Sequence, residues 1–164
     1  VSEPDSPHIN GIRMKDTLVW LHDDDLSPGS PALLAATDPS PVVVLDPSLI
    51  AARGYGLKRL LFIAECALAV PAPVYQGDTV TTLAALAPAH RQIITTATVC
   101  PHTQAVLARL RAVLPAGFPL TIIDPPPFVD LPPGGDLKRF SRYWKRAAPL
   151  AFDGQSSPNR RIAP

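Results

Sequence analysis

Short apolar runs of strand length alternate along this chain with stretches of helical period, and this order restricts the possible folds more than any other feature. The expected strands are 17–22, 41–45, 73–75, 92–99 and 120–123. The expected helices are 31–37, 57–70, 79–86 and 103–114. Because parallel neighbours need helical crossovers, we predict an α/β fold with a five-stranded parallel, doubly wound (Rossmann-like) sheet and helices on both faces.

Capping residues support two of these helices. Ser30 can accept a hydrogen bond at the start of a helix, and Pro31 suits its first turn because a helix needs no N–H donor there. Asp78 is predicted to cap the helix that begins at Thr79. The capping residues therefore agree with the helices that the order of apolar segments predicts.

The chain divides by composition into three parts. Residues 1–13 are interpreted as an upstream extension or an expression remnant, and 14–124 as the folded α/β domain. Residues 125–164 form a proline-rich extension in a chain that has 21 prolines. Lys and Arg number 8 against 12 Asp and Glu over 1–135, but 7 against 2 over 136–164, so the basic character belongs to this extension.

The composition also limits location and redox chemistry. No apolar run approaches the roughly 18 residues that a membrane span needs, and 1–13 does not have the pattern of a secretory signal. Cys66 and Cys100 lack the number and spacing of a disulfide framework or a zinc site, so we expect two buried thiols. We therefore expect a soluble, cytoplasmic protein.

The extension contains one amphipathic pattern, at about 137–148. Its apolar stripe is predicted to hold Leu137, Phe140, Trp144 and Ala147, beside a flank of basic residues. This helix could bind a nucleic acid or a membrane surface, or its aromatic side chains could pack back on the parent domain, which we favour. The nucleic-acid alternative would depend on Arg142, Lys145 and Arg146.

Several segments resemble, in order, the amino-terminal α/β domain of the photolyase/cryptochrome family. The first strand and its loop match that family at Leu18, Val19, Trp20, Asp24, Pro31, Ala32 and Leu33, and depart from it at His22, Asp23 and Asp25. Weaker matches follow at 41–47, 58–62, 77–78 and 140–146. The likeness extends over about 17–146.

The resemblance implies that an antenna-binding half is present and that the catalytic half is absent. In that family the redox FAD and the DNA lesion belong to a helical domain longer than this whole chain. It therefore implies no redox FAD and no photolyase activity for this chain alone. A flavin or deazaflavin chromophore held within the α/β half, or a second chain that supplies the helical half, remains compatible with it.

The loop after the first strand reads His22-Asp23-Asp24-Asp25, a composition that suggests a metal site. Imidazole and carboxylates suit Zn or Mn, but consecutive residues are not expected to converge on one ion. A solvated acidic loop is the favoured interpretation, with Asp24 structural and no metal assigned. His22 and His102 are both expected at the carboxyl edge of the sheet, where they could meet, although histidines that cap helices or face solvent are commoner.

Anion binding is better supported by the segment 53–58. Two glycines precede a helix start there, although only a single G-x-G is present. No G-x-S-x-G or paired carboxylates suggest hydrolysis, so no catalytic residue is assigned. For a ligand at the carboxyl ends of the first two strands, the candidate residues are His22, Asp24, Asp46, Arg53 and Lys58.

Three functions follow from the sequence. The favoured one is a non-catalytic binding or protein-interaction module, which would form a homo-oligomer or meet a partner through the face that relatives bury against the helical domain. The alternative is a binder of a flavin, deazaflavin or nucleotide-like chromophore, or the accessory half of a two-chain protein. A stand-alone enzyme has the least support.

Overall fold

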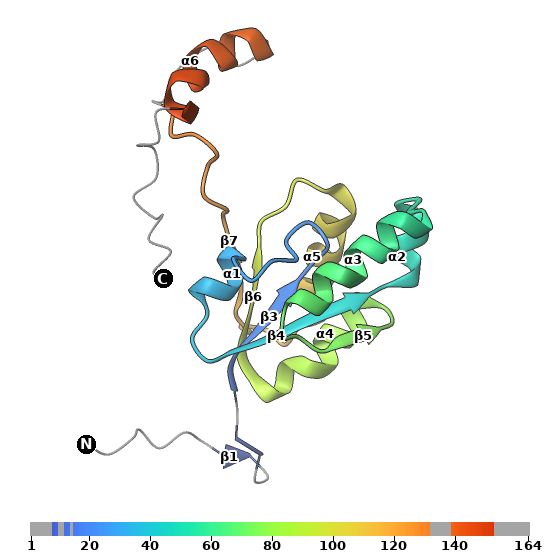
Figure 1. The fold of residues 1–164 in the computed structure, drawn as a ribbon. Helices are drawn as coiled ribbons and strands as arrows, with labels where there is room; N and C mark the ends of the chain where they lie inside the picture. The colour runs from blue at the N-terminus through green and yellow to red at the C-terminus, as the bar shows by residue number, and fades with distance from the viewer. Residues whose placement is uncertain (1–7, 10–11, 14, 132–138, 153–164) are drawn as a thin grey trace, which may run out of the picture. The chain divides into compact units, whose positions relative to one another are not determined.

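The computed structural model describes residues 8–9, 12–13, 15–131 and 139–152 (Figure 1). By its internal contacts the chain divides into two compact units, Val1–Pro125 and Pro126–Pro164. This division lies one residue from the sequence-based boundary at 124.

The first unit contains the predicted five-stranded, fully parallel sheet (Figure 1). Its strands lie in the order β5-β4-β3-β6-β7, and the prediction of the fold class is confirmed. A two-residue antiparallel pair, β1 (His8–Ile9) and β2 (Ile12–Arg13), precedes the sheet. The strands of the sheet are β3 (Lys15–Leu21), β4 (Pro39–Leu45), β5 (Val74–Gln76), β6 (His90–Thr96) and β7 (Leu120–Ile123).

Helices cover both faces of this sheet, and alternation along β3 shows how. Leu18 and Trp20 belong to a buried cluster with residues of α4 and α5, whereas Val19 and Leu21 belong to a second cluster with residues of α1 and α3. Successive strand residues point to opposite faces, so each layer receives its own core. The helices are α1 (Pro31–Ala35), α2 (Pro47–Ala52), α3 (Leu57–Ala69), α4 (Thr79–Leu86), the 3-10 turn η1 (Ala87–Ala89) and α5 (Pro101–Val113).

Local signals act largely as predicted, with two corrections. Ser30 caps α1 and Asp78 caps α4. The sequence prediction missed α2, a six-residue helix that begins at Pro47 behind the cap Asp46 and is followed by Gly54 at a φ of 62°. It also extended β6 to Val99, although β6 ends at Thr96 and Val99 is exposed.

The second unit contains α6 (Phe140–Phe152). The Phe140 and Trp144 rings are stacked with centroids 5.9 Å apart, and Ala147 is buried, as the predicted stripe requires. The helix begins later and ends later than predicted, and it continues through Pro149. Leu137, the fourth member of that stripe, lies outside the described residues.

Within the part of the chain that the structure describes, every helix is too short or too polar to cross a bilayer.

Candidate functional site

The candidate site lies at the topological switch point of the sheet. The chain places β4 on one side of β3 and later places β6 on the other side, so the loops that follow β3 and β6 lead in opposite directions at the carboxyl edge. In open α/β sheets, ligands bind in the crevice at such a switch point. His22 follows β3 directly, and 97–100 connects β6 to α5.

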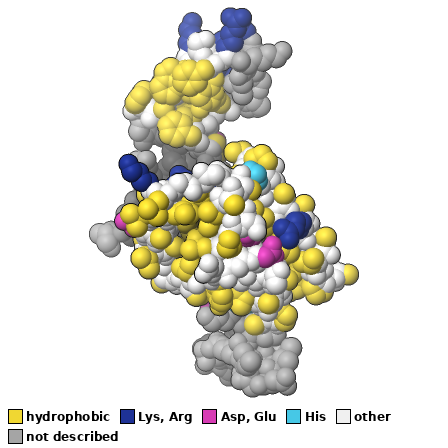
Figure 2. Space-filling view, turned by 90° about the vertical axis from the view of Figure 1, so that its right-hand side faces the viewer, with side chains coloured by type: hydrophobic (Ala, Val, Ile, Leu, Met, Phe, Trp, Pro, Cys, Tyr) yellow, Lys and Arg dark blue, Asp and Glu magenta, His cyan; other side chains and the backbone are white. Residues whose placement is uncertain are grey.

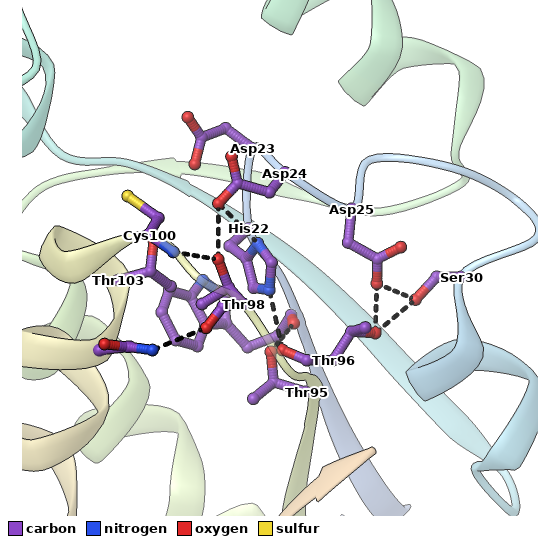
Figure 3. A network of polar contacts seen from close by, with 12 residues as sticks. His22, Asp23, Asp24, Asp25, Ser30, Thr95, Thr96, Thr98, Cys100 and Thr103 are labelled. Atoms are coloured by element: carbon purple, nitrogen blue, oxygen red, sulfur yellow. Dashed lines mark hydrogen bonds and ion pairs between the residues drawn. The ribbon is translucent and has the colours of Figure 1, made fainter. Parts of the chain in front are cut away.

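His22 is held in this crevice by the neighbouring strand. Its side chain is 3% exposed, and its Nε2 lies 3.0 Å from the carbonyl oxygen of Thr96, the last residue of β6 (Figure 3). A carbonyl oxygen only accepts, so Nε2 carries a hydrogen and donates it. The other ring nitrogen, Nδ1, lies 3.9 Å from Asp24 Oδ2.

The acidic residues after His22 are not equivalent. Asp24 accepts a 2.9 Å hydrogen bond from the Thr98 hydroxyl, which connects the loop after β3 to the loop after β6 (Figure 3). Asp25 accepts hydrogen bonds from the hydroxyls of Ser30 and Thr96 and so ties α1 to the end of β6. A turn closed by the 2.9 Å bond from Asp25 N to His22 O folds this segment back on itself.

Asp23 belongs to a separate network centred on Arg53. The guanidinium donates to Asp23, Tyr55 and Thr103, and the Tyr55 hydroxyl also donates to Asp23. The side chains of Arg53 and Asp23 are 7% and 18% exposed, so this ion pair is largely removed from water. The network connects the loop after β3, the end of α2 and the start of α5.

Burial and charge shift two pKa values in this network. Burial alone would lower the pKa of Arg53, but the Tyr55 hydrogen bond and the Asp23 carboxylate outweigh it and the pKa is raised. Burial also raises the pKa of Tyr55, and the hydrogen bond to Asp23 adds to this while Arg53 opposes it. Both groups therefore keep their hydrogens at neutral pH.

Asp46 has a structural role that the list of candidate ligand residues did not anticipate. One carboxylate oxygen accepts from the amides of Ser48 and Leu49 at the start of α2, at 2.9 and 3.3 Å. The other accepts from the amide of Thr79 at the start of α4, at 2.9 Å. Asp46 is therefore buried, with 4% of the residue exposed, and both of its carboxylate oxygens are already bonded. It holds the starts of two helices in place.

A cavity and a groove adjoin at this edge of the sheet. The cavity has a volume of about 50 Å³, and its wall includes Trp20, His22, Asp46, Arg53, Tyr55, Thr79 and Thr103. The groove has a volume of about 630 Å³ and lies between α2, α3 and the ends of β4 and β5. They share Leu45, Ile50, Tyr55 and Leu60.

Buried polar atoms without partners mark this region. Among the described residues, three buried side-chain atoms have no hydrogen-bond partner: His22 Nδ1, Arg53 Nε and Thr79 Oγ1. All three residues line the cavity. Because an unpaired buried polar atom costs about 1–3 kcal/mol, such atoms indicate a place built to receive a polar group or water.

The structure brings together four of the five predicted ligand residues and separates the fifth. His22, Asp46 and Arg53 line the cavity and Asp24 lies beside His22, whereas Lys58 is exposed on α3 outside both the cavity and the groove. His102 is exposed on α5. Sequence reasoning missed Tyr55, Thr79 and Thr103; Thr79 and Thr103 could have been found as residues of the helix starts that follow strands at the ligand-binding edge.

Comparison with known proteins adds no identification: no protein-family model and no curated protein matches this chain. The fold and the site define a Rossmann-like α/β domain with a crevice at its switch point. The resemblance to the photolyase/cryptochrome family stays a prediction.

Proposed function

We propose that this chain is a non-catalytic binding module that holds a flat heteroaromatic ligand of flavin, deazaflavin or nucleotide type. The observation that carries the proposal is the pair of unpartnered buried atoms, Arg53 Nε and Thr79 Oγ1, in residues that line a cavity adjoining an apolar groove. The ring system would lie in the groove, and its polar edge would reach the cavity.

Volume decides where such a ligand can go. A cavity of about 50 Å³ holds one or two water molecules, each of which takes about 30 Å³ in the liquid. The groove, at about 630 Å³, lies within the range of about 300–1,000 Å³ that is usual for small-molecule sites. The body of the ligand therefore belongs in the groove, and only a carbonyl, hydroxyl or ring nitrogen belongs in the cavity.

The groove suits a flat ring because of what lines it. Ten of its eleven lining residues are apolar, aromatic or glycine, the exception being Gln76 on β5. Tyr55 lines both spaces, and its hydroxyl is fixed by its bonds to Asp23 and Arg53. Ligand pockets commonly combine such an apolar wall with a few placed polar groups.

Filling the groove should abolish ligand binding. In Ala64→Trp, an indole on α3 would occupy the groove, and affinity for riboflavin should fall at least tenfold. Flavins and deazaflavins fluoresce in the visible, so quenching of the ligand's own emission reports binding in the parent and in both variants, whose added tryptophan absorbs only in the ultraviolet. Titration with riboflavin, FMN and a deazaflavin measures the effect.

The matched control is Ala69→Trp, since Ala69 is exposed on the same helix and lies outside the groove. It should bind as the parent protein does. A protein that is colourless when purified from its own source and shows no saturable quenching with these three probes would refute the proposal. Equal affinities for Ala64→Trp and Ala69→Trp would refute this placement.

A second candidate function, self-association, is favoured by the outer face of α3. Four large apolar side chains on this helix are more than half exposed: Leu57, Leu61, Phe62 and Leu68. Figure 2 shows hydrophobic side chains gathered over much of the side of the molecule turned to the viewer. Exposed apolar area of this extent on one helix is typical of an interaction surface.

The occupant that this face fits is a second copy of the chain. Lys58 and Arg59 lie at the start of α3 and Glu65 lies beyond its middle. In an antiparallel two-fold pairing, the basic end of each helix would come opposite the acidic half of the other, so the surface is self-complementary in charge as well as apolar.

Leu61→Glu should therefore convert a dimer to a monomer, because two buried carboxylates would face each other across the two-fold axis. Light scattering at several concentrations measures the mass. The control is Leu34→Glu, at a leucine on α1 that is even more exposed than Leu61. A parent protein that is monomeric throughout the concentration series would contradict this candidate.

A further inference from the structure

The loop after β3 presents three potential metal ligands to one point. One ligand atom each from His22, Asp23 and Asp24 lies within 4.8 Å of the others. The turn closed by Asp25 N and His22 O brings both aspartates back toward the ring, so three of these four consecutive residues come close to one point, which the sequence alone did not favour.

Hydrogen bonding fixes which imidazole nitrogen is available. Nε2 donates to the Thr96 carbonyl, so in the neutral ring Nδ1 bears a lone pair. Nδ1 is buried without a hydrogen-bond partner, in a side chain that is 3% exposed, and it lies 3.9 Å from Asp24 Oδ2. The Nδ1 lone pair and the Asp24 carboxylate are both acceptors, so they cannot form a hydrogen bond with each other. A cation that lies between them would be a ligand partner for both.

The surrounding contacts are those of an oriented metal site. Histidine ligands usually donate their second N–H to a carbonyl or carboxylate, as Nε2 of His22 does. The carboxylates are held as well: Asp24 accepts from the Thr98 hydroxyl (Figure 3). Asp23 accepts from Arg53 and from the Tyr55 hydroxyl. Bonds of about 2.0–2.2 Å place neighbouring ligand atoms about 3.3–3.6 Å apart in a tetrahedral shell, so a spacing of up to 4.8 Å must close by about 1 Å when an ion binds.

We propose that His22 Nδ1, Asp24 and Asp23 form a binding site for a divalent transition-metal ion of the Zn²⁺, Co²⁺ or Mn²⁺ type. One imidazole and two carboxylates favour these ions over Mg²⁺ and Ca²⁺, which prefer oxygen ligands alone. Water completes the coordination shell, and the charge of Arg53 offsets part of the negative charge of the two carboxylates. This site does not depend on the ligand in the groove.

Cobalt titration tests the site through a visible signal that does not require any activity. The full chain, stripped of metal with a chelator, should bind one Co²⁺ with a d–d absorption band that Zn²⁺ abolishes by displacement. Asp24→Asn should weaken Co²⁺ binding at least tenfold. This variant should still fold, because the Asp24 side chain is 37% exposed and the amide oxygen can still accept from Thr98.

Two further variants complete the test. His22→Gln should lose the band, and His102→Gln, at an exposed histidine on α5, should keep it. Thermal unfolding gives an independent readout: at the same Zn²⁺ concentration, the midpoint of the parent protein should rise more than that of Asp24→Asn. Absence of stoichiometric binding, or equal affinity in the parent and Asp24→Asn, would overturn the proposal, and neither result would affect ligand binding in the groove, which Asp24 does not line.

Discussion

Replacing Asp46 by alanine should lower the free energy of unfolding by about 3 kcal/mol. The carboxylate caps α2 through two amides and α4 through the Thr79 amide, and all three donors would lose their acceptor at once. A lost cap costs about 1 kcal/mol, and a buried donor left unpaired costs about 1–3 kcal/mol. Urea denaturation followed by circular dichroism measures the change.

Asp78 provides the matched control for Asp46. It caps only α4, through a 2.8 Å bond from the Thr81 amide, and its side chain is 38% exposed. That amide hydrogen bond lowers the pKa of Asp78, so the cap is charged at neutral pH and is lost only as the pH falls below the ordinary aspartate range. Asp78→Ala should cost about 1 kcal/mol. Equal losses for the two variants would show that Asp46 does not join the two helices.

Arg53→Met should be destabilising to a similar extent, by about 3 kcal/mol. It leaves the Asp23 carboxylate in a largely dry setting with only the Tyr55 hydroxyl as a donor. Breaking a buried ion pair on one side typically costs 3–5 kcal/mol, and the partial exposure of Asp23 places this case at the lower end. The same denaturation experiment applies.

Two comparisons separate the ion pair from a general effect of losing an arginine. Arg91→Met removes an exposed pair with Asp16, whose side chains are 51% and 42% exposed, and should change stability by less than about 0.5 kcal/mol. The double variant Asp23→Asn with Arg53→Met should be more stable than the sum of the single losses predicts. Strict additivity would mean that the two side chains are not coupled.

The sheet could be predicted because its signals are local and repeated. Apolar β-branched runs gave the strands, and Asp78 before Thr79 gave the start of α4 to the residue. The end of β6 could not be predicted in this way, since Thr98 and Val99 continue the same β-branched pattern. The neighbouring strand β7 determines where β6 ends. Thr96 is paired with Ile123 at the end of β7, and the prolines that follow at 125–127 have no N–H to donate to a longer β6.

The site was predicted in part for a related reason. His22 and Arg53 could be placed at the carboxyl edge, because strand order alone brings the loops there. Which atoms meet depends on the turn after His22 and on the short helix α2, whose six residues are too few for a periodic signal. The pair Asp46-Pro47 was the sequence signal that could have predicted α2, because aspartate often caps a helix that begins with proline. The same cap explains why the Asp46 carboxylate binds backbone amides and not a ligand.

The bonds of Asp46 to both helices couple the movement of α2 to the movement of α4. The cavity wall includes Leu49, Ile50 and Arg53 from α2 and its end. Any widening of the cavity that displaces α2 therefore pulls on the carboxylate that secures the first turn of α4. Entry of a bulky ligand would then be detected at the start of α4, as faster exchange of the Thr79 amide with solvent deuterium. Asp46 therefore transmits a displacement of α2 to the first turn of α4.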